Sequence, residues 1–125
     1  MTELLHGDLS EKIIGSAMHV LNVLRPGLDE KLYERALIIE LRKRGCLVEQ
    51  QKQFPVQYEE QPIGTLIPDI IVDGRIIVDA KVATSFNDSH LSQMIGYLAI
   101  CQLELGLLLN FKFAKLQWKR VVKQS

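Results

Sequence analysis

The sequence predicts one small α/β domain with two N-terminal helices, a three-stranded antiparallel meander, a third helix and two further strands in a mixed sheet. The spacing of apolar residues supports this order, because it is helical up to about residue 44, alternates over 46–82 and is helical again after residue 87. The 125 residues, 47% of them hydrophobic, suffice for one core and are too few for two. We therefore expect residues 1–125 to form a single domain.

Two helices are expected in the first third of the chain. Asp8 followed by Glu11 resembles a capping box, and the apolar residues after it predict a helix over about 9–24. Pro26-Gly27 ends this helix. A second amphipathic pattern then covers about 28–44, with basic residues in its last turn.

The rest of the chain predicts strands around a third helix. The expected strands are 46–58, 63–72, 75–82, 106–113 and 116–122, and the N-cap candidates of the third helix are Asn87, Asp88 and Ser89.

Charge and cysteine content limit the classes of partner. Lys and Arg together number 15, as do Asp and Glu, so there is no global positive field and any nucleic-acid contact must come from a local patch. Cys46 and Cys101 lack metal-ligand spacing and are expected to be free thiols in a reducing compartment. The longest apolar runs fall far short of the roughly 20 residues that cross a bilayer. We expect a soluble, cytoplasmic protein without membrane association.

Three charged residues, Asp69, Asp79 and Lys81, lie in the most hydrophobic part of the sequence, where an ionised side chain is costly unless it is paired or binds a metal. Alternation places Asp79 and Lys81 on one face of their strand. If Asp73-Gly74 were a two-residue turn, Asp69 would face the other way. A three-residue loop would instead pair Val72 with the residue after Arg75 and bring Asp69 opposite Asp79, and we predict this second register.

Two neighbouring carboxylates repel each other, and a divalent cation with oxygen ligands removes the repulsion. Mg²⁺ is the usual occupant of such a site, and the peptide carbonyl of Ala80 is a further candidate ligand. Lys81 would hold or deprotonate a water, or neutralise charge on a phosphate. These residues favour metal-assisted phosphodiester hydrolysis, whereas the competing interpretation is a structural cluster of ion pairs.

Pro68-Asp69, nine intervening residues and Asp79-Ala80-Lys81 resemble the PD-(D/E)xK motif. The segment from Gly27 through Glu30 to Tyr33 is similar to the signature of the GxxExxY proteins, a branch of that nuclease-like superfamily, and the similarity extends over about residues 10–122. The resemblance implies a restriction-endonuclease-like core in this chain.

The resemblance also implies roles for individual residues. Asp69 and Asp79 would hold the metal, with Glu30 completing the site from the preceding helix, and Lys81 would act in catalysis. Gln93 would lie near the scissile phosphate. The GxxExxY branch usually has Glu where this chain has Asp79, whose shorter side chain would shift the metal.

Two functions follow as hypotheses. The first is a nuclease dependent on Mg²⁺ or Mn²⁺ that hydrolyses phosphodiester bonds in DNA or RNA. The second is a catalytically weak or inactive module, as a homodimer for example, that binds nucleic acid or a protein partner. The basic residues of 112–123, with Trp118 among them, suggest either a phosphate-binding stripe or a solvated strand edge.

Overall fold

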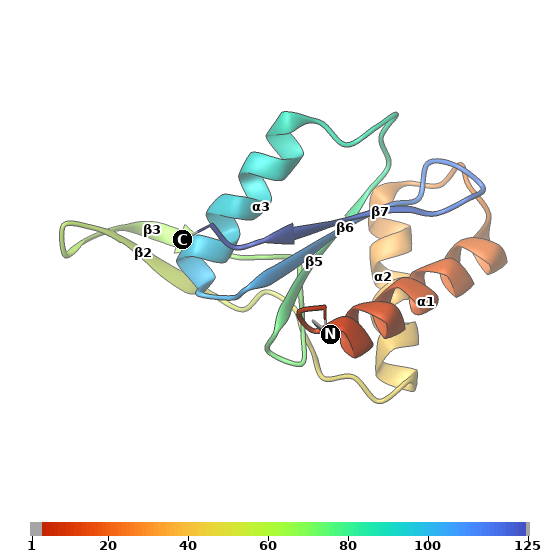
Figure 1. The fold of residues 1–125 in the computed structure, drawn as a ribbon, viewed down its shortest axis with the longest axis horizontal. Coiled ribbons are helices and arrows are strands. Elements are labelled where there is room, and N and C mark those ends of the chain that lie inside the picture. Colours follow the sequence, from red (N-terminus) through yellow and green to blue (C-terminus); the bar gives the residue numbers. More distant parts are fainter. Residues whose placement is uncertain (1–3, 125) are drawn as a thin grey trace.

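The computed structural model describes residues 4–124 and has the expected order of elements (Figure 1). The helices are α1 (Gly7–Leu24), α2 (Glu30–Lys43) and α3 (Asp88–Cys101). The strands are β1 (Val48–Glu49), β2 (Phe54–Tyr58), β3 (Gln61–Leu66), β4 (Ile70–Val72), β5 (Ile76–Lys81), β6 (Leu105–Asn110) and β7 (Gln117–Val122).

The helix ends agree with the prediction at α3 and differ at α1. The Asn87 side chain accepts a hydrogen bond from the His90 backbone N–H, and His90 Nδ1 accepts one from the Asn87 N–H, so Asn87 is the N-cap. The capping box predicted at Asp8 and Glu11 is wrong. Helix α1 begins earlier, after His6, whose side chain makes no cap hydrogen bond, so Asp8 lies inside the first turn, where the helix dipole favours an acid.

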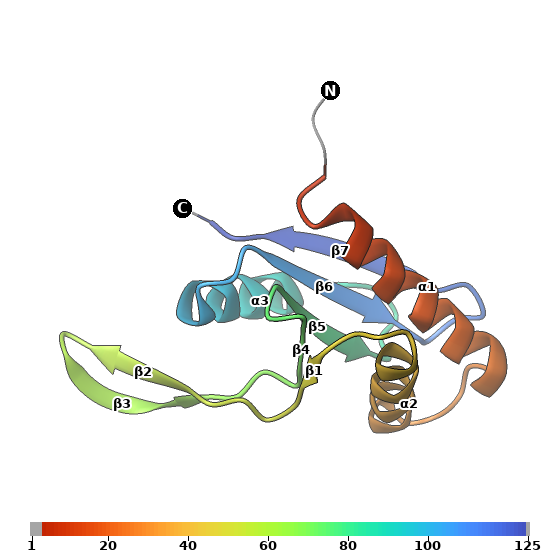
Figure 2. The same cartoon turned by 90° about the horizontal axis from the view of Figure 1, so that it is seen from below.

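Five strands form one mixed sheet in the order β1-β4-β5-β6-β7, in which β5 and β6 are parallel and the other neighbours are antiparallel. Strands β1, β4 and β5 are the antiparallel trio expected from the sequence. The long strands predicted over 46–58 and 63–72 are each interrupted, and the end of the first pairs with the beginning of the second as a separate β2–β3 hairpin. The interruptions fall at Gln51, which has a φ of 57°, and at Pro68, which cannot donate to a ladder. The hairpin projects from one side of the molecule (Figure 2).

The β4–β5 connection has the predicted three-residue loop. Val72 pairs with Ile76 and Ile70 with Val78, so the next step of the register takes Asp69 toward Asp79. Asp73 and Gly74 have φ values of 52° and 64°. The Asp73 carboxylate accepts a hydrogen bond of 2.8 Å from the Leu47 N–H, which fixes this loop against the segment leading into β1.

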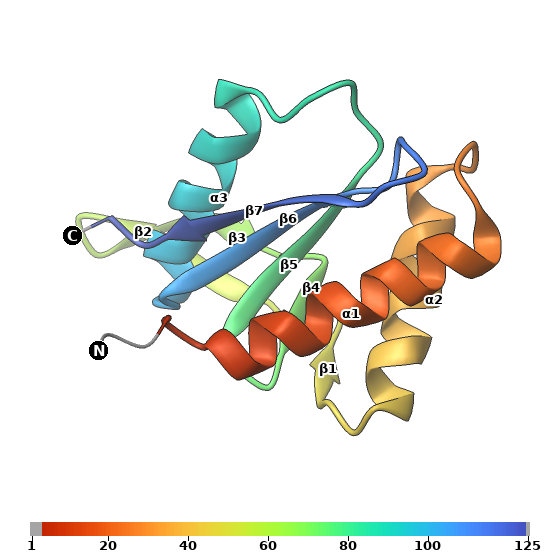
Figure 3. The ribbon, with the colours of Figure 1, turned by 45° about the vertical axis from the view of Figure 1, so that its right-hand side comes forward.

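Helices cover both faces of the sheet. Helices α1 and α2 pack on one face, against inward side chains of β4, β5 and β6 such as Ile70, Val78 and Leu107. Helix α3 packs on the opposite face, where Met94 and Leu98 meet Ile71, Ile77 and Leu108. Figure 3 shows α1 and α2 on one side of the strands and α3 on the other. The alternation of β5 therefore directs Asp79 and Lys81 to the α3 face.

Cys46 and Cys101 are buried and free, as predicted. No helix within residues 4–124 is long and apolar enough to cross a bilayer.

Candidate active site

The structure brings the five predicted catalytic residues to one small pocket of about 70 Å³. Its lining consists of Glu30 from α2, Asp69 before β4, Asp79 and Lys81 of β5, Gln93 and Tyr97 of α3, and the strand residues Ile77 and Val78. Four separate segments of the chain thus meet at the end of β5.

Asp79 and Lys81 form an ion pair inside this pocket. Lys81 Nζ lies 3.2 Å from Asp79 Oδ2, and the two side chains are only 18% and 15% exposed. Burial raises the pKa of the Asp79 carboxyl because it disfavours the charged form, and Lys81 opposes this rise. The negative charges of Asp69 and Glu30 add to the rise in the pKa of Asp79, which shows that the three acids lie within electrostatic reach of one another.

Glu30 links the start of α2 to the end of β5. Its Oε1 accepts a hydrogen bond of 3.0 Å from the Val82 N–H, directly after Lys81. An acid in the first turn of a helix is favoured by the helix dipole, but this contact gives Glu30 a further role in joining two elements of the pocket.

Tyr33 fixes the loop from which α2 begins. The ring is fully buried and stacks on Phe111, with ring centroids 4.8 Å apart and an angle of 8° between the planes. The hydroxyl donates to the Arg25 carbonyl and accepts from the Leu28 N–H at 3.1 Å. The ring therefore packs in the core while the hydroxyl binds the loop that precedes α2.

Glu34 is a neighbour of Asp69 that the sequence reasoning missed. It is half-buried and pairs with Lys31 at 3.2 Å. Burial raises the pKa of Glu34, the hydrogen bond from Lys31 lowers it, and the charge of Asp69 raises it further. The four-residue spacing from Glu30 places both acids on one face of α2, and this signal was available in the sequence.

Helix α3 contributes a hydrogen-bonded pair to the pocket. Gln93 Nε2 donates to Tyr97 Oη at 3.1 Å, so Tyr97 orients the amide that the sequence singled out. The Met94 side chain of α3 lies directly over Gly106 of β6, where a Cβ would stand 2.3 Å from Met94 Sδ. A side chain at position 106 would therefore displace Met94, the residue next to Gln93.

Asn110 holds the loop that follows Lys81. Its side chain is fully buried, donates to the Ala83 carbonyl at 2.7 Å and to Gln117 Oε1 at 3.1 Å, and accepts from the N–H groups of Ala83 and Lys112. The amide therefore ties the chain leaving β5 to the end of β6.

Comparison with known protein families identifies the superfamily. A family model described as the PD-(D/E)XK nuclease superfamily matches residues 7–121. The chain belongs to the PD-(D/E)XK nuclease superfamily. The match confirms the predicted family and the restriction-endonuclease-like fold, and it is compatible with the GxxExxY branch. No curated protein and no solved structure matches the chain.

Members of the PD-(D/E)XK superfamily typically use divalent metals, and the donors in this pocket fit such an ion. Asp69, Asp79 and Glu30 supply carboxylate oxygens, and Mg²⁺ is commonly held by one or two carboxylates together with waters and substrate phosphate. Within residues 4–124 no three acidic, histidine or cysteine side chains converge as a ready-made cage. Ala80 packs its methyl group into the core on the other face, so only its backbone carbonyl is a candidate ligand.

Two of the basic residues near the C-terminus, Lys119 and Arg120, lie on opposite faces of β7. Side chains alternate along β7, which places Lys119 with Val121 on the α3 face and Trp118 with Arg120 on the other. Arg120 donates to Ser10 Oγ at 2.7 Å and to the Leu5 carbonyl, so it anchors the start of α1.

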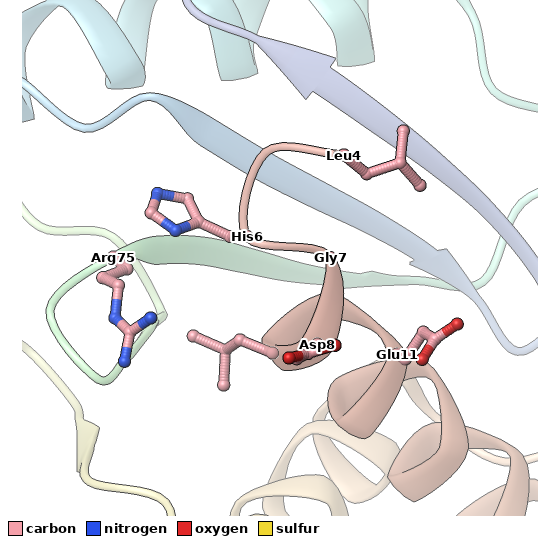
Figure 4. A pocket seen from close by; sticks show the side chains of 7 residues that line it. Leu4, His6, Gly7, Asp8, Glu11 and Arg75 are labelled. Carbon is pink, nitrogen blue, oxygen red and sulfur yellow. The ribbon is translucent and has the colours of Figure 1, made fainter. Parts of the chain in front are cut away.

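A larger hollow of about 400 Å³ lies at the beginning of α1 and contains none of the predicted site residues. Figure 4 shows Arg75 of the β4–β5 loop and His6 toward one side of this hollow and Glu11 toward the other, with Asp8 between them. Its mixed charges give no defined chemistry, and the superfamily's acids and lysine lie elsewhere.

Proposed function

We propose that this chain is a Mg²⁺-dependent nuclease that hydrolyses phosphodiester bonds in DNA or RNA. One observation carries the proposal: four separate segments of a chain that belongs to a nuclease superfamily line one pocket, and they contribute Glu30, Asp69, Asp79 with Lys81, and Gln93. A purely structural ion-pair cluster would need only Asp79 and Lys81.

The side chains divide the proposed reaction among them. Asp69 and Asp79 would hold the cation, with Glu30 and the Ala80 carbonyl completing its surroundings. When bound, a divalent ion neutralises these carboxylates and polarises the phosphodiester. The oxygen of a water molecule would form a bond to phosphorus and release one of its protons to solvent, the bond from phosphorus to the leaving oxygen would break, and the leaving oxygen would take a proton from solvent.

Lys81 is suited to stabilising charge in this reaction. Its Nζ lies beside Asp79 at the pocket and would face negative charge that builds on the phosphate oxygens. Gln93, oriented by Tyr97, would donate its amide N–H to a phosphate oxygen from the α3 side.

Labelled single- and double-stranded DNA and RNA would test the proposal, each incubated with Mg²⁺, with Mn²⁺ and with a chelator. We expect cleavage that requires the metal and is lost in Lys81→Ala but retained in Lys43→Ala, a lysine at the far end of α2. Equal cleavage by wild type and Lys81→Ala would indicate contamination. Binding without metal-dependent cleavage would refute the nuclease and favour a non-catalytic nucleic-acid module.

A further inference from the structure

A second pocket adjoins the proposed catalytic pocket across Asp69, and we call it the flanking pocket. It has a volume of about 430 Å³, within the range of sites that bind small organic groups. Its lining consists of Lys31, Glu34 and Arg35 of α2, Gln50 and Gln51 between β1 and β2, Ile67 and Pro68 after β3, and the shared Asp69. A nucleic-acid strand that places one phosphate beside Asp79 and Lys81 can continue over Asp69 into the flanking pocket.

The positive charges of the flanking pocket come from one face of α2. Lys31 and Arg35 are four residues apart, so their side chains lie on the same side of the helix. Lys31 is engaged by Glu34 at 3.2 Å. Arg35 is exposed and forms no ion pair with any residue of 4–124, which leaves its guanidinium donors for an external anion.

Other residues of the lining offer groups that suit a nucleobase. Gln50 and Gln51 are exposed and carry amides that can both donate and accept hydrogen bonds. Ile67 is 45% exposed and provides an apolar surface beside them. A base can enter such a pocket only when it is unstacked, which is the state of a single strand, whereas a duplex keeps its bases inside.

We propose that the flanking pocket binds the nucleotide next to the scissile phosphate of a single-stranded nucleic acid. Arg35, assisted by Lys31, holds the phosphate of that nucleotide, and Gln50 and Gln51 contact its base over Ile67. The direction of the strand rests on the proposed nuclease function, but the binding itself does not require cleavage.

Fluorescence anisotropy with a labelled oligothymidylate, and with a blunt duplex of the same length, tests this binding with Ca²⁺ in place of Mg²⁺. We expect the single strand to bind more tightly than the duplex. Arg35→Ala should weaken single-strand binding about ten-fold and reduce the slope of log affinity against log salt by about 0.7, the value for one lost phosphate contact. Lys43→Ala, on the same helix outside the pocket, is the matched control and should bind as wild type does.

Thermal unfolding is measured for Arg35→Ala and for a second variant, Arg35→Gln. Unfolding temperatures equal to that of the wild type distinguish a loss of binding from a loss of fold. Wild-type affinity in both variants, or tighter binding of the duplex, overturns the flanking-pocket proposal. Cleavage in Mg²⁺ is measured on the same samples. Cleavage with unchanged binding in the Arg35 variants overturns only the flanking pocket, whereas Arg35-dependent binding without cleavage by wild type overturns only the nuclease.

Discussion

Replacing Gly106 by Ala tests how closely α3 must approach the sheet. The new Cβ would stand 2.3 Å from Met94 Sδ and 2.6 Å from Met94 Cγ. Ordinary contacts between such atoms are roughly 3.5–4.0 Å, so Met94 or the whole helix must retreat by about 1 Å. Met94 is only 2% exposed and belongs to the buried cluster between α3 and the sheet.

The displacement of Met94 has an energetic consequence, and where α3 moves with it, a geometric one. Overpacking a filled core costs about 1–3 kcal/mol, and we expect Gly106→Ala to lower the free energy of unfolding by that amount. Gln93 is the residue before Met94, so it moves with the helix. A displacement of about 1 Å in a reacting group can lower a rate by about 100-fold, and we expect the proposed cleavage to fall by up to that factor.

Urea denaturation at constant pH measures the stability, with an unchanged dependence on urea showing that the folded state stays compact. Gly96→Ala is the matched control, because it lies on exposed α3 surface with open space around it and should gain up to about 1 kcal/mol. Met94→Ala combined with Gly106→Ala should lose less stability than the two single changes added together. Wild-type stability in Gly106→Ala, or strict additivity in the pair, would refute the close contact.

Three further substitutions address the site and its supports. Burial raises the pKa of Asp79 in the folded protein. Its contribution to stability is therefore complete below the unfolded-state pKa of about 3.9 and is lost as pH rises through the folded-state pKa. Urea midpoints measured across pH should show this loss, and Asp79→Asn should remove the pH dependence that Asp79 causes. Tyr33→Phe keeps the stacked ring but leaves the Leu28 N–H without its acceptor, so chemical denaturation should show a loss of about 1–3 kcal/mol, and no loss would contradict these hydrogen bonds. Asn110→Ala should lower the free energy of unfolding by about 2–4 kcal/mol and speed hydrogen exchange at the Ala83 amide. Unchanged protection of the Ala83 amide would contradict the hydrogen bonds between Asn110 and Ala83.

The order of helices and strands could be predicted from the sequence because it depends on local periodicity. The N-cap at Asn87 followed from a short polar side chain before an apolar helical pattern. The β4–β5 register also followed, because a two-residue turn would have put the two aspartates on opposite faces of a buried hairpin. The family's motif then identified Glu30 and Gln93, which periodicity alone would have left as ordinary helix residues.

The β2–β3 hairpin could not be predicted in this way. Its residues alternate like those of the main sheet, and the signals that separate it are a left-handed residue at Gln51 and the break at Pro68. A left-handed conformation at glutamine has no clear sequence signature, since many residue types adopt it once neighbouring contacts compensate the strain. The early start of α1 could not be predicted from the sequence either, because contacts from Arg120 at the far end of the chain anchor its first turn.

The sequence by itself determined the element order, the faces of the strands and the set of acids and lysine available for chemistry, because these depend on residues close together in the chain. Only the tertiary structure decided that Glu30 bonds to the Val82 N–H, that Glu34 lies beside Asp69 and that a second pocket opens next to Arg35. The two contacts and the pocket all join segments separated by long stretches of chain. The packing of the helices against the faces of the sheet sets the distances between these segments.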